Sequence, residues 1–218
     1  MTVPSLPDRL GPYEPLVELA SGGMGNVYVG RRVGAGGFEH LVVLKRMRPD
    51  LLEDRKFYEM LRDEARIASL IRHPNAVPVT DVIEDGSDLV LVMEYVESCA
   101  LDVLLQAARS KNRRLPIAAA SRIGCDVLAG LHAAHEAVDE LGHRLEIVHR
   151  DVSPQNVIVG VDGSSRVIDF GVAKARGRLV STQGGESLKG KYGYMSPEQV
   201  RREPTDRRTD VFAAGVVL

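Results

Sequence analysis

The sequence has little of what marks a secreted, membrane or nucleic-acid-binding chain. It contains only two cysteines, Cys99 and Cys125, which favours a reducing compartment; both are expected to be buried free thiols in helical segments. No apolar run approaches the roughly 20 residues that a membrane-spanning helix needs. Lys and Arg number 28 against 30 Asp and Glu, so no broad positive field attracts nucleic acid or anionic lipid. The proline-containing residues 1–12 lack the apolar core of a signal peptide, and we expect a cytoplasmic protein.

The pattern of apolar residues changes along the chain. Clusters of β-branched residues separated by Gly, Asp and Pro predict strands in the first 96 residues, and one amphipathic helix is predicted from Arg55 to Ile71. Farther along, helical patterns dominate, above all an Ala-rich segment over Pro116–Val138, with Ile123, Val127, Leu128 and Leu131 on one face. The predicted strands are Asn26–Val29, Leu41–Leu44, Val77–Ile83, Leu89–Val92, Val157–Val159 and Arg166–Ile168.

These patterns predict an α+β fold with two lobes. An extension of residues 1–12 precedes a β-rich N-terminal lobe over 13–96, and a mainly helical C-terminal lobe follows over 97–218. The connection between them is predicted near Glu94–Glu97. A loop rich in Gly and Ser is expected at about 175–193.

A glycine-rich hairpin is predicted near the start of the first lobe. Glycines there let backbone N–H groups approach phosphates without a Cβ in the way. A strand follows the glycines, which argues against a dinucleotide-binding fingerprint, and the Gly-Lys-Ser/Thr order of a P-loop is absent. Taken alone, such a hairpin is more often a simple turn. Its residues are Leu19, Ala20, Ser21, Gly22, Gly23, Met24, Gly25, Asn26 and Val27.

A lysine and a glutamate are suitably spaced to act on a nucleotide. Lys45 ends the apolar run Val42–Leu44, and Glu64 lies nineteen residues later within the predicted long helix. A Lys held by a Glu can neutralise phosphate charge in a site with little water. A single lysine at a strand edge is otherwise a solvent-facing residue.

The most informative stretch contains His149-Arg150-Asp151 and Asn156, followed by Asp169-Phe170-Gly171. One carboxylate can orient and deprotonate an attacking hydroxyl, while an amide oxygen and a second carboxylate can hold Mg²⁺, which prefers oxygen ligands. Each residue alone has an ordinary structural explanation as a cap or turn residue. Their order and spacing together point to phosphoryl transfer.

On these motifs the sequence resembles a eukaryotic-like protein kinase of the bacterial Ser/Thr type, from about Tyr13 to Leu218. Ser196-Pro197-Glu198 and Asp210, which opens an apolar helical segment, extend the resemblance. It implies the two-lobed protein-kinase fold, and by the family's pattern the chain ends within a helix, so the second lobe is expected to be incomplete. The Arg150 preceding Asp151 implies regulation by phosphorylation of the activation loop, with Ser181, Thr182 and Ser187 as candidate acceptors.

The same resemblance implies roles around the nucleotide. Backbone groups of Glu94 and Val96 would bind adenine, with Met93 as gatekeeper, and Val27, Val43 and Ile158 would sandwich the base. A hydrophobic spine would contain Ala68, Val79, His149 and Phe170. Asn156 and Asp169 would be the metal ligands.

Four positions depart from the family pattern. Ala20 replaces the usual first loop glycine, and Val43 replaces an alanine over the adenine. Ser153 stands where Ser/Thr kinases usually carry a lysine, while Lys191 stands where they usually carry a threonine. We therefore predict a reciprocal exchange in which Lys191 brings the ammonium to the γ-phosphate and Ser153 supplies the hydroxyl; the alternative is a degenerate, slow site.

The predicted function is transfer of the ATP γ-phosphoryl group to Ser or Thr hydroxyls of proteins, with ATP and Mg²⁺ as cofactors and Mn²⁺ as an alternative metal. Asp151, Lys45 and Glu64, with Lys191 and Ser153, are the predicted catalytic residues. The rival is a catalytically weak or inactive nucleotide-binding module, and a small-molecule phosphotransferase ranks third. Protein substrates are the expected partners, without nucleic acid. His132 and His135 are expected to be structural or surface residues, because no third metal ligand accompanies them.

Overall fold

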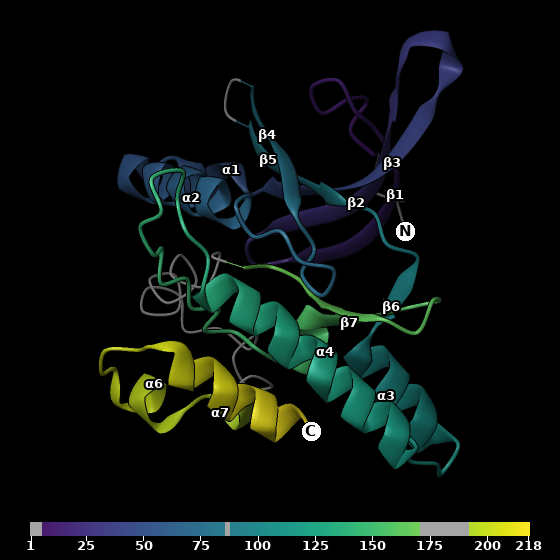
Figure 1. Cartoon of the computed structure of the whole chain (residues 1–218). Helices are drawn as coiled ribbons and strands as arrows, with labels where there is room; N and C mark the ends of the chain where they lie inside the picture. The colour runs from purple at the N-terminus through teal and green to yellow at the C-terminus, as the bar shows by residue number, and fades with distance from the viewer. Residues whose placement is uncertain (1–5, 86–87, 171–191) are drawn as a thin grey trace. The chain divides into compact units, whose positions relative to one another are not determined.

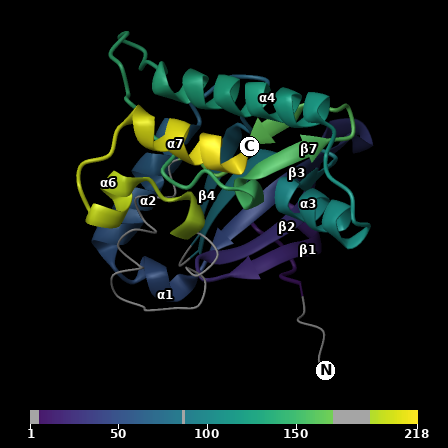
Figure 2. The same ribbon diagram turned by 90° about the horizontal axis from the view of Figure 1, so that it is seen from below.

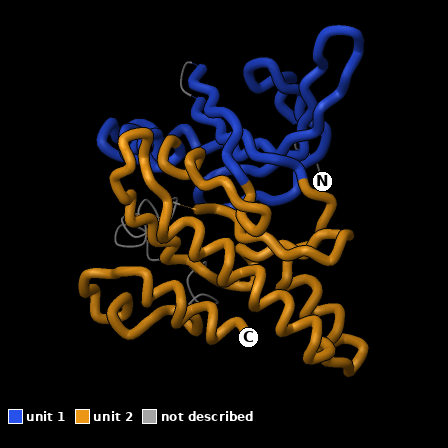
Figure 3. Tube along the Cα trace, in the orientation of Figure 1, with its two compact units in different colours: residues 1–65, 78–95 blue, residues 66–77, 96–218 orange. Residues whose placement is uncertain are grey.

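The computed structural model describes residues 6–85, 88–170 and 192–218. The chain divides into two compact units (Figure 3): unit 1 comprises residues 1–65 and 78–95, and unit 2 comprises residues 66–77 and 96–218. The sequence predicted an unbroken first lobe over 13–96, whereas residues 66–77 belong to unit 2. Their backbone explains the difference, because Val77 N donates to Val167 O and Val167 N donates to Asn75 O, both at 2.9 Å.

Unit 1 is built on a five-stranded antiparallel sheet with the order β1-β2-β3-β5-β4 (Figure 1). The predicted β-rich character is confirmed. Strands β2, β3 and β5 extend beyond the predicted apolar clusters because their pairing continues into polar residues, whereas β4 begins at Val79 and not at the predicted Val77, whose amide donates to Val167 O. The strands are β1 (Glu14–Gly22), β2 (Gly25–Val33), β3 (Glu39–Met47), β4 (Val79–Asp85) and β5 (Asp88–Glu94). A 3₁₀ turn, η1 (Ala35–Gly37), joins β2 to β3.

The two faces of this sheet carry different side chains. One face is covered by Leu10 and Tyr13 from the N-terminal segment and forms a hydrophobic core cluster. This core also contains Tyr28, Val42, Leu44, Val90 and Val92. Because side chains alternate along a strand, the residues at odd positions of β3, Val43 and Lys45, lie on the opposite face.

Two helices belong to the segment after β3. The short α1 (Pro49–Leu52) precedes α2 (Arg55–Ala68), which confirms the predicted helix but ends three residues before Ile71. Ser69 Oγ donates to Arg66 O at 2.7 Å, and the following amides bond three residues back. This local competition for the last carbonyls ends the helix although the apolar pattern continues.

Unit 2 consists of helices around a small three-stranded sheet with the order β6-β7-β8. Helix α4 packs against β8 and against α7, and Figures 1 and 2 both show α4 and α7 side by side. The α elements are α3 (Leu101–Ser110), α4 (Ile117–His135), α6 (Pro197–Arg201) and α7 (Arg207–Val217). The strands and 3₁₀ turns are β6 (Ser98–Ala100), β7 (Val157–Gly160), β8 (Ser165–Val167), η2 (Pro154–Asn156) and η4 (Tyr192–Tyr194).

Some expectations were wrong. Cys99 and Cys125 are free but exposed, and Cys99 lies in β6 rather than in a helix. Leu128 is exposed, although Ile123, Val127 and Leu131 on the same helix are buried. These differences arise because a short apolar context does not specify which side of an element faces the core. No helix among the described residues is both long and apolar enough to span a membrane.

Candidate active site

The predicted glycine-rich segment is a tight hairpin between β1 and β2. The strands pair down to Gly22 and Gly25, with Gly23 and Met24 at the turn. Gly25 has φ of +154°, and a Cβ added there would lie 1.9 Å from Arg46 O. Only glycine fits this position, because the hairpin backbone approaches β3 so closely. Met24 O in turn accepts from Arg48 N at 3.0 Å, so the turn is tied to the end of β3.

Strand register places the predicted nucleotide residues of unit 1 on one face of the sheet. Val27 lies opposite Lys45, and Val29 lies opposite Val43. On the other side of β3, Met93 lies opposite Val43. Directly opposed residues share a face, so the ammonium-bearing residue and the apolar residues predicted to contact adenine are brought together within this unit.

Lys45 and Glu64 are both buried in unit 1, with exposed fractions of 5% and 7%. A lone lysine in a strand is expected to face solvent, but Lys45 lies in β3, the central strand of the sheet, and its side chain is buried. An isolated charge is costly to bury, so burial of both residues suits an ion pair. The pairing of these two side chains with each other stays a prediction.

Glu94 and Val96 are the residues predicted to bind adenine through their backbone. In each of them, one backbone group is already hydrogen-bonded within the protein. Glu94 N donates to Pro78 O at 3.3 Å, so the Glu94 carbonyl is the group suited to a ligand. In unit 2, Val96 O accepts from Ser98 Oγ at 2.9 Å. Its amide is therefore the better candidate donor.

The catalytic-loop residues form a compact hydrogen-bonded group in unit 2. Asn156 closes the turn η2, is buried, and donates through Nδ2 to Asp151 O at 2.7 Å and to Asp151 Oδ2 at 2.8 Å. The amide nitrogen thus fixes the Asp151 carboxylate. The Asn156 amide oxygen is left as the atom with metal-ligand chemistry.

A buried carboxylate on α7 positions the backbone of this loop. Asp210 is fully buried and accepts from His149 N at 2.8 Å and from Arg150 N at 2.7 Å. His135 Nε2 lies 2.8 Å from Asp210 Oδ2, so His135 has a structural partner. Arg150 has φ of +63°, a costly backbone conformation for a non-glycine residue that such a network can hold.

Asp169 is tied to the same group through its neighbours. Ile168 N donates to Asn156 O at 3.0 Å, and the Ile168 carbonyl lies 2.8 Å from His149 Nε2. The rings of His149 and Phe170 meet edge-on at a centroid distance of 4.9 Å. Asp169 itself has φ of +65°. An amide oxygen and a carboxylate on linked backbone segments match the oxygen donors that Mg²⁺ prefers.

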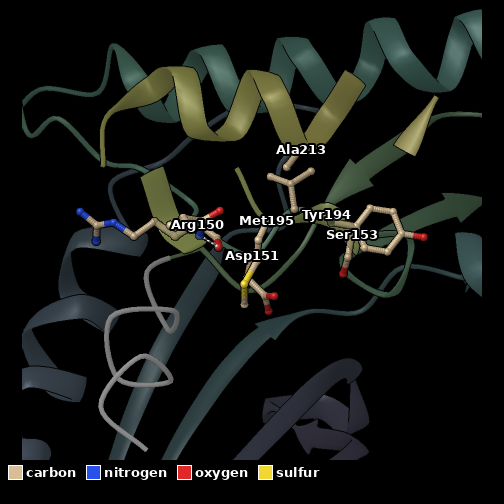
Figure 4. Close-up of a pocket in the computed structure, with 8 residues that line it drawn as sticks. Arg150, Asp151, Ser153, Tyr194, Met195 and Ala213 are labelled. Atoms are coloured by element: carbon tan, nitrogen blue, oxygen red, sulfur yellow. Dashed lines mark hydrogen bonds between the residues drawn. The ribbon is translucent and has the colours of Figure 1, made fainter. Parts of the chain in front are cut away.

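Beside the catalytic loop lies a small pocket of about 20 Å³, enough for about one water molecule. Figure 4 shows Asp151 and Ser153 at this pocket together with Tyr194 and Met195. Ser153 is only 2% exposed, and its Oγ has no hydrogen-bond partner among the described residues. An unpaired buried hydroxyl costs about 1–3 kcal/mol.

Other predicted residues lie elsewhere or outside the described residues. Ile158 is on β7, opposite Ala100 and Arg166. Two residues that contact Arg150 were missed from the sequence, Gln199 and Thr205. The Ser196-x-x-Gln199 capping box, which has a sequence signature, could have drawn attention to Gln199. Predictions were also made for residues that lie outside the described ones, namely Gly171, Ser181, Thr182, Ser187 and Lys191.

The chain is similar in sequence to known protein kinases. The Tyrosine-protein kinase MasK of Myxococcus xanthus is 43% identical over 95% of this chain and 32% of its own length. Serine/threonine-protein kinase PrkC of Bacillus subtilis is 33% identical, over 95% of this chain and 30% of its own length. The chain thus spans about a third of the length of these relatives.

A solved structure supports the fold. A double mutant of the PknI kinase domain from Mycobacterium tuberculosis matches with a TM-score of 0.74 at 23% identity, covering 98% of this chain and 74% of that one. The predicted protein-kinase fold is therefore confirmed. The family model described as protein kinase domain matches residues 13–218. With this match over nearly the whole chain, the protein belongs to the protein kinase family.

Proposed function

We propose that this chain is the part of a protein kinase that binds ATP and transfers its γ-phosphoryl group to protein hydroxyls, chiefly those of Ser and Thr. The observation that carries the proposal is the double hydrogen bond from Asn156 Nδ2 to Asp151. This bond orients the Asp151 carboxylate, which can then accept a proton, and leaves the amide oxygen of Asn156 to bind a metal. Protein kinases use ATP with a divalent metal, generally Mg²⁺.

Each residue then has a separable task. Asp151 orients the acceptor hydroxyl and takes its proton, while Asn156 and Asp169 supply oxygen ligands to Mg²⁺, which neutralises phosphate charge when bound. Lys45, oriented by Glu64, neutralises charge on the nucleotide phosphates, and the Gly25 hairpin supplies backbone N–H groups. The backbone groups of Glu94 and Val96 bind adenine, and Val27, Val43 and Ile158 contact the base.

The reciprocal exchange of Ser153 and Lys191 belongs to this proposal. The Ser153 Oγ supports it, because a hydroxyl that is buried without a hydrogen-bond partner among the described residues can bond a group that arrives with the substrates. Lys191 would bring the ammonium to the γ-phosphate. Regulation by phosphorylation of the activation loop, read by Arg150, and a cytoplasmic location are further parts of the proposal.

Tyrosine is a second candidate acceptor, and two observations favour it. MasK, at 43% identity, carries the name of a tyrosine kinase, whereas the Ser/Thr kinase PrkC is 33% identical. In addition, Ser153 replaces the lysine typical of Ser/Thr kinases. Phosphoamino-acid analysis of the autophosphorylated full-length protein separates the two: phosphoserine and phosphothreonine are expected, and phosphotyrosine alone would move the assignment to tyrosine.

The test of the activity itself compares the full-length protein with Asp151→Asn, which keeps the size of the side chain but removes its charge. Phosphoryl transfer from labelled ATP should fall by at least about a hundredfold, while Mg²⁺-dependent nucleotide binding persists. Equal incorporation by the two proteins would contradict the proposal. Nucleotide binding without any transfer in the wild type would favour the non-catalytic module.

A further inference from the structure

Arg150 is fixed at three points by residues that follow it by about 50 to 60 positions. Its amide donates to Asp210 Oδ1 at 2.7 Å, and its carbonyl accepts from Gln199 Nε2 at 2.8 Å. Its guanidinium Nε donates to Thr205 Oγ1 at 2.9 Å. The two backbone contacts explain the left-handed conformation of the residue, but the third contact acts on the side chain alone.

The Thr205 hydroxyl is a well-defined acceptor. Thr205 follows Pro204, whose ring restricts the backbone, and its own β-branched side chain has few rotamers. It precedes Asp206, the N-cap of α7, whose side chain accepts from Arg208 N at 2.8 Å. The hydroxyl is therefore held near the start of the same helix whose Asp210 binds the Arg150 backbone.

The charge of Arg150 has no acidic partner in the part of the chain that the structure describes, where its only side-chain hydrogen bond is the one to Thr205. Because Nε is occupied by a neutral oxygen, the N–H groups of the two terminal nitrogens remain for another acceptor. Figure 4 shows the Arg150 side chain pointing away from Asp151 and Ser153. The Arg150 guanidinium and the Asp151 carboxylate thus point in different directions from the catalytic loop.

We propose that Thr205 is a positioning residue that aims the Arg150 guanidinium so that its terminal Nη1/Nη2 edge binds a phosphate monoester. This inference rests on the proposed regulation by phosphorylation. A guanidinium binds two phosphate oxygens in a fixed fork geometry, so the orientation of the fork decides the affinity. Without the Thr205 contact the fork rotates, and a bound phosphate stimulates the enzyme less.

The test uses Thr205→Val, which keeps the shape and removes the acceptor, and Thr205→Ser, which keeps the hydroxyl as a matched control. The ratio of activity between autophosphorylated and phosphatase-treated full-length protein should fall roughly tenfold in Thr205→Val, the low end for a hydrogen bond to a charged group in a half-buried site. Thr205→Ser should keep the wild-type ratio. The unphosphorylated forms of all three proteins should have equal activity.

A second readout separates this idea from the regulation on which it rests. In arginine-labelled protein, the Arg150 Nε–H should exchange slowly with solvent in wild type and Thr205→Ser, and at least about tenfold faster in Thr205→Val. Unchanged exchange in Thr205→Val, or an unchanged activity ratio, would overturn the role of Thr205. If the wild type itself shows no stimulation but Nε–H is protected, the proposed regulation fails and so does phosphate binding by Arg150, leaving only a structural contact.

Discussion

In unit 1, strand pairing positions Lys45. In unit 2, Asn156 Nδ2 holds the Asp151 carboxylate, and the buried carboxylate of Asp210 holds the backbone just before it. The pairing of β2, β3 and β5 repeats along the strands, so many backbone bonds share the task. In unit 2, Asp210 alone accepts from two successive backbone amides. A strand held by a ladder should tolerate the loss of one contact, whereas a loop with two successive amides bonded to one side chain should be sensitive to the loss of that side chain.

The largest expected effect comes from Asp210. Asp210→Ala leaves the backbone N–H groups of His149 and Arg150, together with His135, without their acceptor, and should lower the free energy of unfolding by about 3–5 kcal/mol. Asp210→Asn keeps one oxygen, and should cost about 1–3 kcal/mol. Chemical denaturation of the full-length protein measures both. The exposed Glu203→Gln is the control for loss of one negative charge, and a loss as large as that of Asp210→Asn in this control would contradict the special role of Asp210.

In unit 1, the residue whose substitution should cost the most stability is Gly25. Gly25→Ala places a Cβ against Arg46 O, and should cost about 2–4 kcal/mol through backbone strain and displacement of the hairpin. Gly22→Ala is the matched control, since an added Cβ meets nothing within 4 Å there. Thermal unfolding should show a loss of stability in Gly25→Ala only, and ATP titration should show weaker binding in Gly25→Ala than in wild type. Equal behaviour of the two variants would show that the hairpin adjusts freely.

The sequence was most informative where a simple period governs the structure. The cluster of β-branched residues predicted a strand over Leu41–Leu44, and the pairing of β3 with β2 and β5 confirms it. The strand β6 was missed because Ser98–Ala100 is too short to show a period and forms through pairing with β7. The helix α2 was predicted too long because Leu70 and Ile71 continue the apolar pattern after Ser69 has ended the helix.

The geometry of unit 2 was less predictable, because it depends on contacts between distant residues. Spacing alone suggested Asp151, Asn156 and Asp169 as a group, but the left-handed conformations of Arg150 and Asp169 have no sequence signal. The role of Gln199 as a donor to Arg150 O arises only when α6 is placed beside the catalytic loop. Such contacts join residues 49 positions apart, which local patterns do not encode.

Ser153 offers a further test in unit 2, because its buried hydroxyl has no hydrogen-bond partner among the described residues. Ser153→Ala should raise the stability by about 1 kcal/mol, since an unsatisfied buried hydroxyl is removed, and should lower kcat about tenfold if the hydroxyl acts in the reaction. Ser165→Ala is a close control, because Ser165 Oγ on β8 is also buried without a partner among the described residues. It should raise the stability similarly and leave kcat unchanged. An unchanged kcat in Ser153→Ala would remove Ser153 from the proposed mechanism.

The smallest effect concerns Glu198, which is linked to α7 by a hydrogen bond from Thr209 Oγ1 at 2.7 Å. This bond, together with backbone and Ser196 contacts, lowers the pKa of the Glu198 carboxyl below its ordinary value of 4.5. A lowered folded-state pKa means that the ionised form stabilises the fold above about pH 4.5, and that this contribution is lost as the pH falls through the folded-state pKa. Glu198→Gln should therefore make the unfolding free energy slightly less pH-dependent below pH 4.5, and denaturation at pH 3 to 6 measures it. Because solvent screens this carboxyl, the change should be smaller than that for any variant above, and a steeper acid dependence in Glu198→Gln would contradict the sign of the shift.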